Sequence, residues 1–377
     1  MSLFTDFDLL PSLQATLAEK NLVTPTEIQS RAIPALLEER SVIGVSETGS
    51  GKTLAYVLPI LHLLKSMENR GLRFNFDSMP RACVVVPTRE LGEQVTRVFK
   101  PFTHTTRLRV RSVLGGTTLD IAKRSVQGPF EVLVATPGRL VKLIDRGLVN
   151  LTDVRILVFD EADQMLDQGF LPDANKIAGA CTVALQRALF SATVSPAVQK
   201  LMNELFSGAE IIRTQGSNYL VPTLTTENLT VVNGKRFPLL ETLLNQSVPG
   251  GTLIFTNTRE QCDKLAGDLL KSNRGCAIYR GEMSKVERRS NLKAFRDGKV
   301  KLLISTDLAS RGLDVDHVGR VINYHLPQQM ENYIHRVGRT ARAGREGLVV
   351  NLVTERDQAL VEQLHGIRGA SKSGRVG

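Results

Sequence analysis

The chain contains no tryptophan, and only 5% of its 377 residues are aromatic. It therefore lacks an obvious set of rings on which single-stranded bases could stack, so any contact with nucleic acid is expected to involve the sugar-phosphate backbone. The four cysteines, Cys83, Cys181, Cys262 and Cys276, are isolated in the sequence, without the paired spacing of a zinc site or a disulfide framework. They are interpreted as reduced packing residues of a cytoplasmic protein.

Long apolar runs are also missing. No stretch reaches the ~18 residues that suggest a membrane span, and no charged segment followed by an apolar one resembles a signal peptide, so no membrane association is expected. Lys and Arg number 48 against 38 acidic residues, a net charge of +10 that favours a polyanionic partner. A length of 377 residues exceeds one typical core and predicts two domains.

A glycine-rich segment predicts a phosphate-binding loop. It comprises Ser46, Glu47, Thr48, Gly49, Ser50, Gly51, Lys52 and Thr53. In such a loop, glycines let backbone N–H groups surround the phosphates, a lysine reaches the β- and γ-phosphates, and a hydroxyl binds Mg²⁺. Here Lys52 would be the cation and Thr53 the metal ligand. Ser46 departs from the strict pattern, which has glycine at this position.

The sequence on either side of the loop supports this interpretation. Residues 41–45 predict a strand entering the loop, and the pattern from Leu54 onward predicts a helix leaving it, whose positive dipole end favours phosphate. An ordinary Gly/Ser turn is the alternative. A second apolar run, 156–159, predicts a buried parallel strand that places Asp160 and Glu161 at the carboxyl end of a sheet.

These two acidic residues complete a predicted NTP-hydrolysing site. Asp160 is expected to bind Mg²⁺, and Glu161 to orient and deprotonate the attacking water. Taken alone, an acidic cluster at the start of a helix could be a simple N-terminal charge cluster. The phosphate loop favours the catalytic interpretation.

Strand-like runs separated by helical stretches predict an α/β protein with two tandem doubly wound parallel sheets. The runs are 82–86, 110–114, 132–135, 156–159 and 188–190, followed by 229–232, 252–255, 277–279, 301–304, 318–323 and 349–353. Turn formers between the two series suggest a linker over residues 213–224. The expected domains are therefore 1–212 and 225–377.

A basic cluster in the second domain contains His335, Arg336, Arg339 and Arg342. On a helix, Arg339 and Arg342 would lie one turn apart on the same face and could reach the γ-phosphate as arginine fingers when the domains close. A solvated basic helix face is the alternative. Because only the first domain has a phosphate loop, and that domain has no arginine finger of its own, the catalytic interpretation is favoured.

These motifs, in order, resemble those of the DEAD-box RNA helicases, a superfamily-two family with two RecA-like domains. The further strings that carry the resemblance are Pro87-Thr88-Arg89-Glu90-Leu91, Gly115-Gly116, Thr136-Pro137-Gly138-Arg139, Ser191-Ala192-Thr193, Ile254-Phe255-Thr256, Ser305-Thr306-Asp307 and Arg311-Gly312-Leu313-Asp314. The match spans nearly the whole chain. It implies an RNA-stimulated ATPase that uses ATP and Mg²⁺ and locally unwinds short duplexes or remodels ribonucleoprotein.

The resemblance also implies roles in ATP recognition and in coupling. Phe4 and Gln29 resemble the adenine-reading element of the family, and Asp314 the residue that touches the ribose. An amide such as Gln29 suits adenine because it can donate and accept hydrogen bonds at the same time. Leu22 stands where the family usually has an aromatic residue. Ser191, Thr193, Asp163 and His335 resemble the residues that couple the phosphate site to the interdomain cleft, which Asp307 is expected to support.

The implied RNA contacts are Arg89, Gly116, Thr136 and Arg139 in the first domain and Arg280, Gly281 and Thr306 in the second. Loops that offer N–H groups, hydroxyls and guanidinium groups can bind phosphates without reading bases. Arg280 and Lys285 replace the usual His and Gln, which predicts a more salt-sensitive contact. A monomer is expected, and nothing in the sequence identifies a protein partner. The remaining alternatives are an ATP-gated RNA clamp and a DNA-directed motor.

Overall fold

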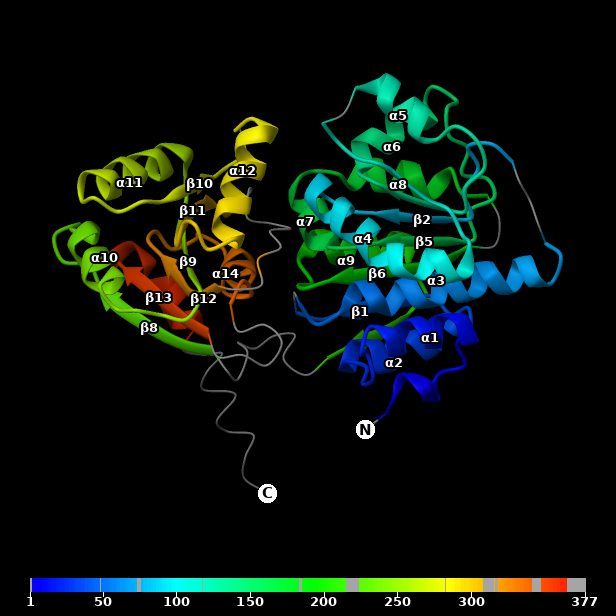
Figure 1. The fold of residues 1–377 in the computed structure, drawn as a ribbon, viewed down its shortest axis with the longest axis horizontal. Helices are drawn as coiled ribbons and strands as arrows, with labels where there is room; N and C mark the ends of the chain where they lie inside the picture. The colour runs from blue at the N-terminus through cyan, green and yellow to red at the C-terminus, as the bar shows by residue number, and fades with distance from the viewer. Residues whose placement is uncertain are drawn as a thin grey trace. The chain divides into compact units, whose positions relative to one another are not determined.

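The chain builds two parallel β-sheets, each within its own unit (Figure 1). The computed structural model describes residues 2–47, 49–72, 76–116, 118–182, 185–214, 224–281, 283–307, 315, 318–340 and 347–364. The chain divides between Ser217 and Asn218, a position within the predicted linker. Most of that linker lies outside the described residues, so its predicted bounds, and those of the two domains, stay a prediction.

The first unit alternates strands and helices along the chain. Its elements are η1 (Phe4–Asp6), α1 (Pro11–Glu19), α2 (Glu27–Leu37), β1 (Val42–Val45), α3 (Lys52–Asn69), β2 (Ala82–Val85), α4 (Arg89–Thr106), β3 (Val110–Val113), α5 (Leu119–Ser125), β4 (Val132–Ala135), α6 (Pro137–Ile144), β5 (Ile156–Phe159), α7 (Ala162–Asp167), α8 (Leu171–Gly179), β6 (Gln186–Ser191), α9 (Pro196–Leu205) and β7 (Glu210–Arg213). Strands β2, β4 and β5 consist entirely of apolar residues because helices cover both faces of the sheet.

The second unit repeats this alternation on a smaller scale. Its elements are β8 (Leu224–Thr230), α10 (Arg236–Leu244), β9 (Gly251–Thr256), α11 (Arg259–Lys271), β10 (Ala277–Tyr279), α12 (Lys285–Arg296), β11 (Leu302–Thr306), β12 (Val318–Asn323), α14 (Met330–Val337), β13 (Gly347–Val353) and η3 (Glu355–Asp357). Within the described ranges, no helix combines the length and hydropathy that a membrane crossing requires.

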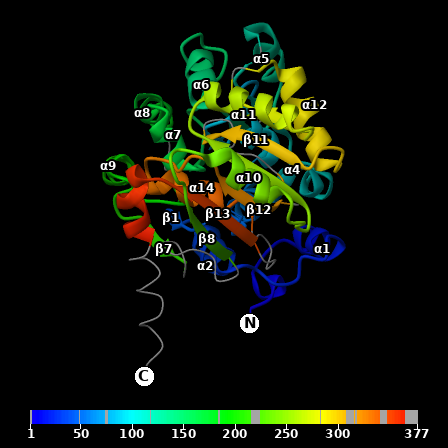
Figure 2. The ribbon, with the colours of Figure 1, turned by 90° about the vertical axis from the view of Figure 1, so that its left-hand side faces the viewer.

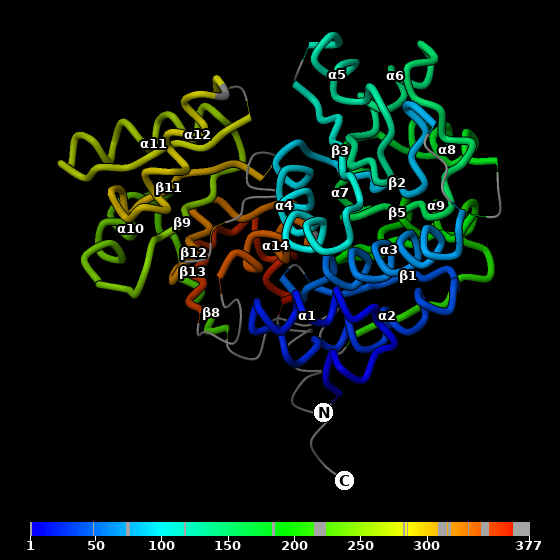
Figure 3. The backbone as a smooth tube through the Cα atoms, turned by 45° about the vertical axis from the view of Figure 1, so that its right-hand side comes forward, coloured from blue at the N-terminus to red at the C-terminus, as the bar shows by residue number. Residues whose placement is uncertain are grey.

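The first sheet has the strand order β3-β4-β2-β5-β6-β1-β7, and neighbouring strands are parallel throughout. One core cluster packs α1 to α4 against one face, with Leu13, Ile28, Leu58 and Phe99 buried, and a second cluster packs α5 to α9 against the other. Figure 3 shows α1 to α4, coloured blue to cyan, on the same side of this sheet. Since the strands are parallel, their carboxyl ends share one edge, and the loops that follow them gather there.

The second sheet has the order β10-β11-β9-β12-β13-β8, again with parallel neighbours. Helices α10 and α11 cover one face, as Figure 2 shows, and their buried residues include Leu240 and Leu265. Residues of α12 and α14, among them Phe295 and Tyr333, pack with the core on the other face. The prediction of two doubly wound parallel-sheet domains is confirmed.

Candidate functional site

The loops that carry the predicted site residues follow a simple order along the first sheet. The predicted phosphate loop follows β1, Asp160 and Glu161 follow β5, and the Ser191-Ala192-Thr193 segment ends β6. Strands β5, β6 and β1 are neighbours in the sheet. The predicted RNA-contact loops follow β3, β4 and β2, which form the adjoining half. The carboxyl edge therefore divides into a half with nucleotide motifs and a half with RNA motifs.

Lys52 begins α3 and is held by its own loop. Its ammonium donates to the backbone carbonyls of Ser46 and Glu47, both at 2.6 Å. Burial lowers the pKa of Lys52, whereas the nearby charges of Asp160 and Glu161 oppose this shift. A buried cation satisfied only by neutral carbonyls can exchange them for phosphate oxygens, which provide stronger charge-assisted bonds. The arrangement therefore suits an anionic ligand.

Gly51 has a left-handed backbone with φ +90°, a conformation that favours glycine and would strain any other residue type. A Cβ atom at Gly51 would lie 2.4 Å from Nε2 of Gln29. That amide nitrogen donates to the Gly51 carbonyl at 3.0 Å, and its Oε1 accepts from Thr26 N at 2.9 Å. An amide has two donor hydrogens and two lone pairs, so one of each is left by these two bonds. Gln29, itself buried, thus joins the phosphate loop to the predicted adenine-reading segment.

The departure at Ser46 has a structural explanation. Its side chain is buried, and its hydroxyl lies 2.9 Å from that of Thr214, just after β7. Its backbone N donates to the Ser191 carbonyl at 3.0 Å. Ser46 therefore connects the start of the phosphate loop to two neighbouring strands, and its side chain points to Thr214.

The two acidic residues after β5 differ in their environments. Asp160 is buried; this burial, assisted by the charge of Glu161, raises its pKa to about 6. Its Oδ2 accepts from the Tyr56 hydroxyl at 2.7 Å, and its Oδ1 from the Glu161 backbone N at 2.9 Å. Glu161 has a left-handed backbone, with φ 49° and ψ 53°. Such a conformation costs about 1–2 kcal/mol for a residue with a Cβ, and it is often found at functional sites.

The chemistry of these side chains fits Mg²⁺. In nucleotide sites this ion uses one or two protein oxygens together with phosphates and waters, so a full cage of ligands is not needed. In the parts of the chain that the structure describes, no group of three or more His, Cys, Asp or Glu side chains could hold a metal. Asp160 supplies a carboxylate, which accepts a hydrogen bond from the Tyr56 hydroxyl, and Thr53 supplies a hydroxyl. The buried negative charge of Asp160 is one that a cation would stabilise.

Three predicted coupling residues lie together in the first unit. Oδ2 of Asp163 accepts from Ala192 N at 3.1 Å, from Thr193 N at 2.9 Å and from the Thr193 hydroxyl at 3.0 Å. The Ser191 hydroxyl accepts from Asp163 N at 3.2 Å and donates to the Thr193 carbonyl at 2.8 Å. A displacement of the segment after β6 would therefore be transmitted to α7, and through it to Glu161.

A prediction follows for Thr193. Thr193→Val removes one hydroxyl bond to Asp163 but preserves the shape of the side chain, so the coupling between RNA and ATP should weaken by about fivefold, within the usual range for such free energies. The measurement is the ratio of RNA-stimulated to basal ATP hydrolysis. Thr193→Ser retains the hydroxyl and should leave that ratio unchanged. Equal losses of stimulated and basal hydrolysis in Thr193→Val would contradict the coupling role.

The predicted RNA contacts of the first unit lie at helix starts and turns. Arg89 is the first residue of α4 and donates to Glu93 at 2.8 Å. The Thr136 hydroxyl accepts from Gly115 N at 3.0 Å, which links the turns after β3 and β4. Gly116, with φ +78°, follows in the same turn. Arg139 lies half-buried in the first turn of α6.

In the second unit, the predicted RNA contacts occupy the equivalent half of the sheet edge. Arg280 and Gly281 follow β10, and Thr306 ends β11, its neighbour. The Arg280 guanidinium donates to Asp263 of α11 at 3.1 Å. This pair is partly exposed, with Asp263 half accessible to solvent. RNA phosphates would therefore compete with a carboxylate for Arg280.

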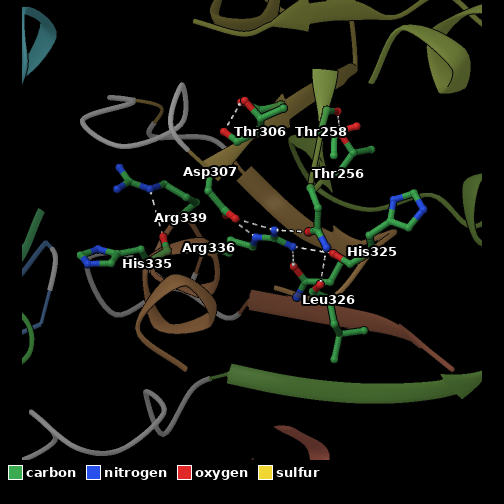
Figure 4. Close-up of polar contacts among 12 residues, drawn as sticks. Thr256, Thr258, Thr306, Asp307, His325, Leu326, His335, Arg336 and Arg339 are labelled. Atoms are coloured by element: carbon green, nitrogen blue, oxygen red, sulfur yellow. Dashed lines mark hydrogen bonds and ion pairs between the residues drawn. The ribbon is translucent and has the colours of Figure 1, made fainter. Parts of the chain in front are cut away.

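The side chain of Arg336 is completely buried in the second unit and makes several polar contacts there (Figure 4). Its five N–H groups are all satisfied. They donate to both carboxylate oxygens of Asp307, to the amide oxygens of Asn257 and Asn323, and to the His325 carbonyl. The guanidinium also lies over the Phe255 ring, 5.0 Å from its centroid. Arg336 thereby ties α14 to the carboxyl ends of β9, β11 and β12, which is a structural role.

Arg339 does not lie on α14, and its predicted helical relation to Arg342 stays a prediction because Arg342 lies outside the described residues. Helix α14 ends at Val337, with Gly338 as its C-cap, so Arg339 lies in the turn beyond it. The Nε of Arg339 donates to the His335 carbonyl at 3.2 Å, as Figure 4 also shows. Glycine ends the helix because it lacks the side chain that favours helical backbone. Arg342, Asp314 and Thr48 lie outside the described residues.

The prediction for Phe4 also needs revision. Its side chain is only 3% exposed and packs edge to face against Phe7, with ring centroids 5.9 Å apart. A ring buried in the core has no face to offer a base. Its backbone N donates to the Val23 carbonyl at 3.0 Å, so Phe4 is joined by this hydrogen bond to the chain just before the predicted adenine-reading segment. Leu22, in contrast, is 39% exposed and available for an apolar contact.

Several residues of the site were not identified from the sequence. They are Tyr56, Thr214, Asn257 and Asn323. The structural role of Arg336 was also not predicted. Tyr56 is 104 residues from Asp160, and Arg336 is 79 residues from Asn257. Only the helical spacing of Tyr56 from Lys52 and Thr53 offered a signal, because residues three and four positions apart share a helix face.

Comparisons with known proteins agree with this geometry. Residues 26–201 match the family model described as DEAD/DEAH box helicase, and residues 235–344 match the helicase conserved C-terminal domain. The chain is 33% identical to the DEAD-box ATP-dependent RNA helicase CshA of Geobacillus kaustophilus, over 99% of this chain and 77% of that protein. It is 35% identical to the DEAD-box ATP-dependent RNA helicase RhpA of Helicobacter pylori, over 93% and 69%.

A solved structure resembles the whole fold. S. cerevisiae Dbp5 bound to RNA and ADP BeF3 superposes with a TM-score of 0.84 at 28% identity, covering 97% of this chain and 93% of that one. This similarity extends over both units, and it agrees with the two family matches and with the motifs along both sheet edges. The chain therefore belongs to the DEAD-box ATP-dependent RNA helicases.

Proposed function

We propose that ATP binds at the β5-β6-β1 half of the first sheet edge and is hydrolysed there. Lys52 binds the β- and γ-phosphates, together with the N–H groups of the loop from Ser46 to Thr53. Gln29 recognises the adenine, with Leu22 packing against it, and Asp314 contacts the ribose. Glu161 orients the attacking water and accepts its proton.

Thr53 and Asp160 are the proposed protein ligands of Mg²⁺. When bound with ATP, the ion neutralises charge on the phosphate oxygens and keeps them in position. The carboxylate of Asp160 is held by two hydrogen bonds, so little reorganisation is needed for it to act as a ligand. Two further features of the chain, the buried Lys52 and the start of α3, favour negative charge at the same position.

RNA binds, in this proposal, along the other half of the first sheet edge and the matching half of the second. The contacts are Arg89, Gly116, Thr136, Arg139, Arg280, Gly281 and Thr306. They approach the sugar-phosphate backbone, so binding should depend on salt more than on sequence. Lys285, from the start of α12, adds further positive charge.

Closure of the two domains would bring Arg339 and Arg342 to the γ-phosphate, where guanidinium groups stabilise the charge of the transition state. RNA bound to both domains and ATP bound at the first sheet edge would then favour the same closed arrangement, so each ligand strengthens the binding of the other. Asp163, Ser191, Thr193 and His335 would transmit this coupling. RNA should therefore stimulate hydrolysis.

The observation that most supports this proposal is the division of the first sheet edge. Nucleotide motifs follow β5, β6 and β1, and RNA motifs follow β3, β4 and β2. The bonds between Asp163 and the segment after β6 lie on the nucleotide side, close to the catalytic carboxylates. A single rigid sheet thus supports both sites, as coupling between them requires.

The experiment is steady-state ATP hydrolysis with no nucleic acid, with single-stranded RNA and with DNA of the same sequence. Single-stranded RNA, but not DNA, should raise the rate of ATP hydrolysis by about tenfold, a typical coupling factor. Lys52→Ala should lose hydrolysis under all three conditions. An unchanged rate with RNA would contradict the proposal, and equal stimulation by DNA would favour a DNA-directed motor.

An ATP-gated clamp shares every motif and differs in turnover. Strand displacement from a short RNA duplex, with ATP in excess, separates the two functions: a helicase releases the strand over many turnovers, whereas a clamp remains bound to the RNA. We further propose that the chain acts as a monomer in the cytoplasm. The monomer is tested by light scattering at working concentration.

A further inference from the structure

Helix geometry places a tyrosine hydroxyl next to both proposed Mg²⁺ ligands. Tyr56 lies four positions after Lys52 and three after Thr53, on the same face of α3. Side chains on a helix tilt toward its N-terminus, so an aromatic ring at this position extends back over the first turn. That turn is where the phosphate loop ends. Tyr56 is fully buried, with 1% of its surface exposed.

The hydroxyl of Tyr56 connects two segments that are distant in sequence. It donates to Oδ2 of Asp160 at 2.7 Å, from a helix position three residues after Thr53. Because the Glu161 backbone N binds the other oxygen of Asp160, the carboxylate is held at both ends. Two contacts of this kind fix the rotation of the carboxylate about its terminal bond, which is otherwise broad.

The ring of Tyr56 is itself supported by packing. It lies 5.4 Å, centroid to centroid, from the ring of Phe190, the residue before Ser191 in β6. Phe190 in turn occupies space left by Gly44 of β1, where a Cβ atom would lie 2.6 Å from that ring. The position of the hydroxyl therefore depends on helix α3 and on two strands of the sheet, β6 and β1, and a simple rotation of the side chain cannot change it.

We propose that Tyr56 is a positioning residue for the metal site of this ATPase, holding the Asp160 carboxylate in the arrangement that binds Mg²⁺ with the nucleotide. This inference rests on the proposed function of Asp160 and Thr53. Phenylalanine at position 56 would fill the same space but could not donate. Oδ2 of Asp160 would then be a buried acceptor without this partner, a loss that costs a free energy of about 1–3 kcal/mol.

The test is calorimetric measurement of ADP binding to the full chain, with Mg²⁺ and with EDTA. The ratio of the two dissociation constants measures how strongly the metal assists binding. For Tyr56→Phe, we expect this ratio to fall about tenfold, the effect of losing one bond to a charged group. We also expect the Mg²⁺ concentration for half-maximal hydrolysis to rise about tenfold, while kcat at saturating Mg²⁺ stays near the wild-type value.

Two controls make the outcomes distinct. Tyr333→Phe removes another buried hydroxyl, which accepts from Asn351 at 3.1 Å in the second unit, and should leave the Mg²⁺ ratio unchanged. If Asp160 is a metal ligand, Asp160→Asn should bring the ratio of the two ADP dissociation constants close to one. An unchanged ratio in this variant would overturn the proposed metal site itself. Suppose that Mg²⁺ no longer assists ADP binding to Asp160→Asn but assists binding to Tyr56→Phe as in the wild type, or more strongly. The positioning role of Tyr56 is then overturned, and the proposed function stands.

Discussion

Glu161→Gln should lower ATP turnover by at least about a hundredfold while ADP and ATP still bind with Mg²⁺. General bases contribute factors of about 10²–10⁴, and the amide retains the shape of the carboxylate but cannot accept the proton. Glu161 follows β5 and reaches its position through a left-handed backbone, with φ 49°. The measurements are steady-state hydrolysis at saturating RNA and calorimetric ATP binding. Retained turnover in this variant would show that another group is the base.

The backbone of Glu161 provides an independent check on this role. Glycine adopts a left-handed conformation without the steric cost that a Cβ atom imposes, so Glu161→Gly should preserve or raise the free energy of unfolding, by up to about 1 kcal/mol. The same variant should be inactive. Strain that is retained only for function is expected to show this combination, whereas a loss of stability in Glu161→Gly would indicate that the glutamate side chain contributes to folding.

Arg336→Met should destabilise the second unit by about 3–5 kcal/mol, the usual consequence of removing one partner from a buried ion pair. The substitution leaves the Asp307 carboxylate without its main charge partner and removes donors from Asn257 and Asn323. The free energy of unfolding can be measured by hydrogen exchange in β11 and β12, which reports on this unit separately. Because the chain contains two compact units, a single two-state free energy of unfolding for the whole chain would be misleading.

A matched control separates this effect from a general loss of charge. Lys293 forms an exposed pair with Asp297 at 3.0 Å on α12, so Lys293→Met should cost less than about 1 kcal/mol. Combining Arg336→Met with Asp307→Asn removes the unpaired charge and should recover part of the stability. If Arg336→Met were no more destabilising than the control, its assignment as a structural residue would be wrong.

The sequence predicted most strands closely, but it missed one edge strand and shortened another. The predicted runs 132–135, 156–159, 277–279 and 318–323 coincide with β4, β5, β10 and β12. Strand β7 was missed, and β8 begins at Leu224, five residues before the predicted start at 229. Both are edge strands, and in β7 only Ile212 is buried. Edge strands are covered less completely by helices, so they lack the continuous apolar run that marks a buried strand.

The predicted coupling residues show what motif order can establish. Asp163, Ser191 and Thr193 were grouped from short strings almost thirty residues apart, and the structure brings them into direct hydrogen-bond contact. Motif order could not reveal that Phe4 would be buried or that α14 would end before Arg339. Both outcomes depend on local packing and helix termination, which a short pattern does not encode.

The sequence by itself determined the fold class, the nucleotide motifs and the family. Apolar runs of strand length reflect burial on both faces, and a phosphate loop needs particular residues at fixed spacing. Only the tertiary structure decided that the Arg336 guanidinium is completely paired and that the Tyr56 hydroxyl binds Asp160. The physical reason is that a hydrogen bond depends on distances of about 3 Å between atoms, and for residues far apart in the chain those distances exist only once the sheet has formed.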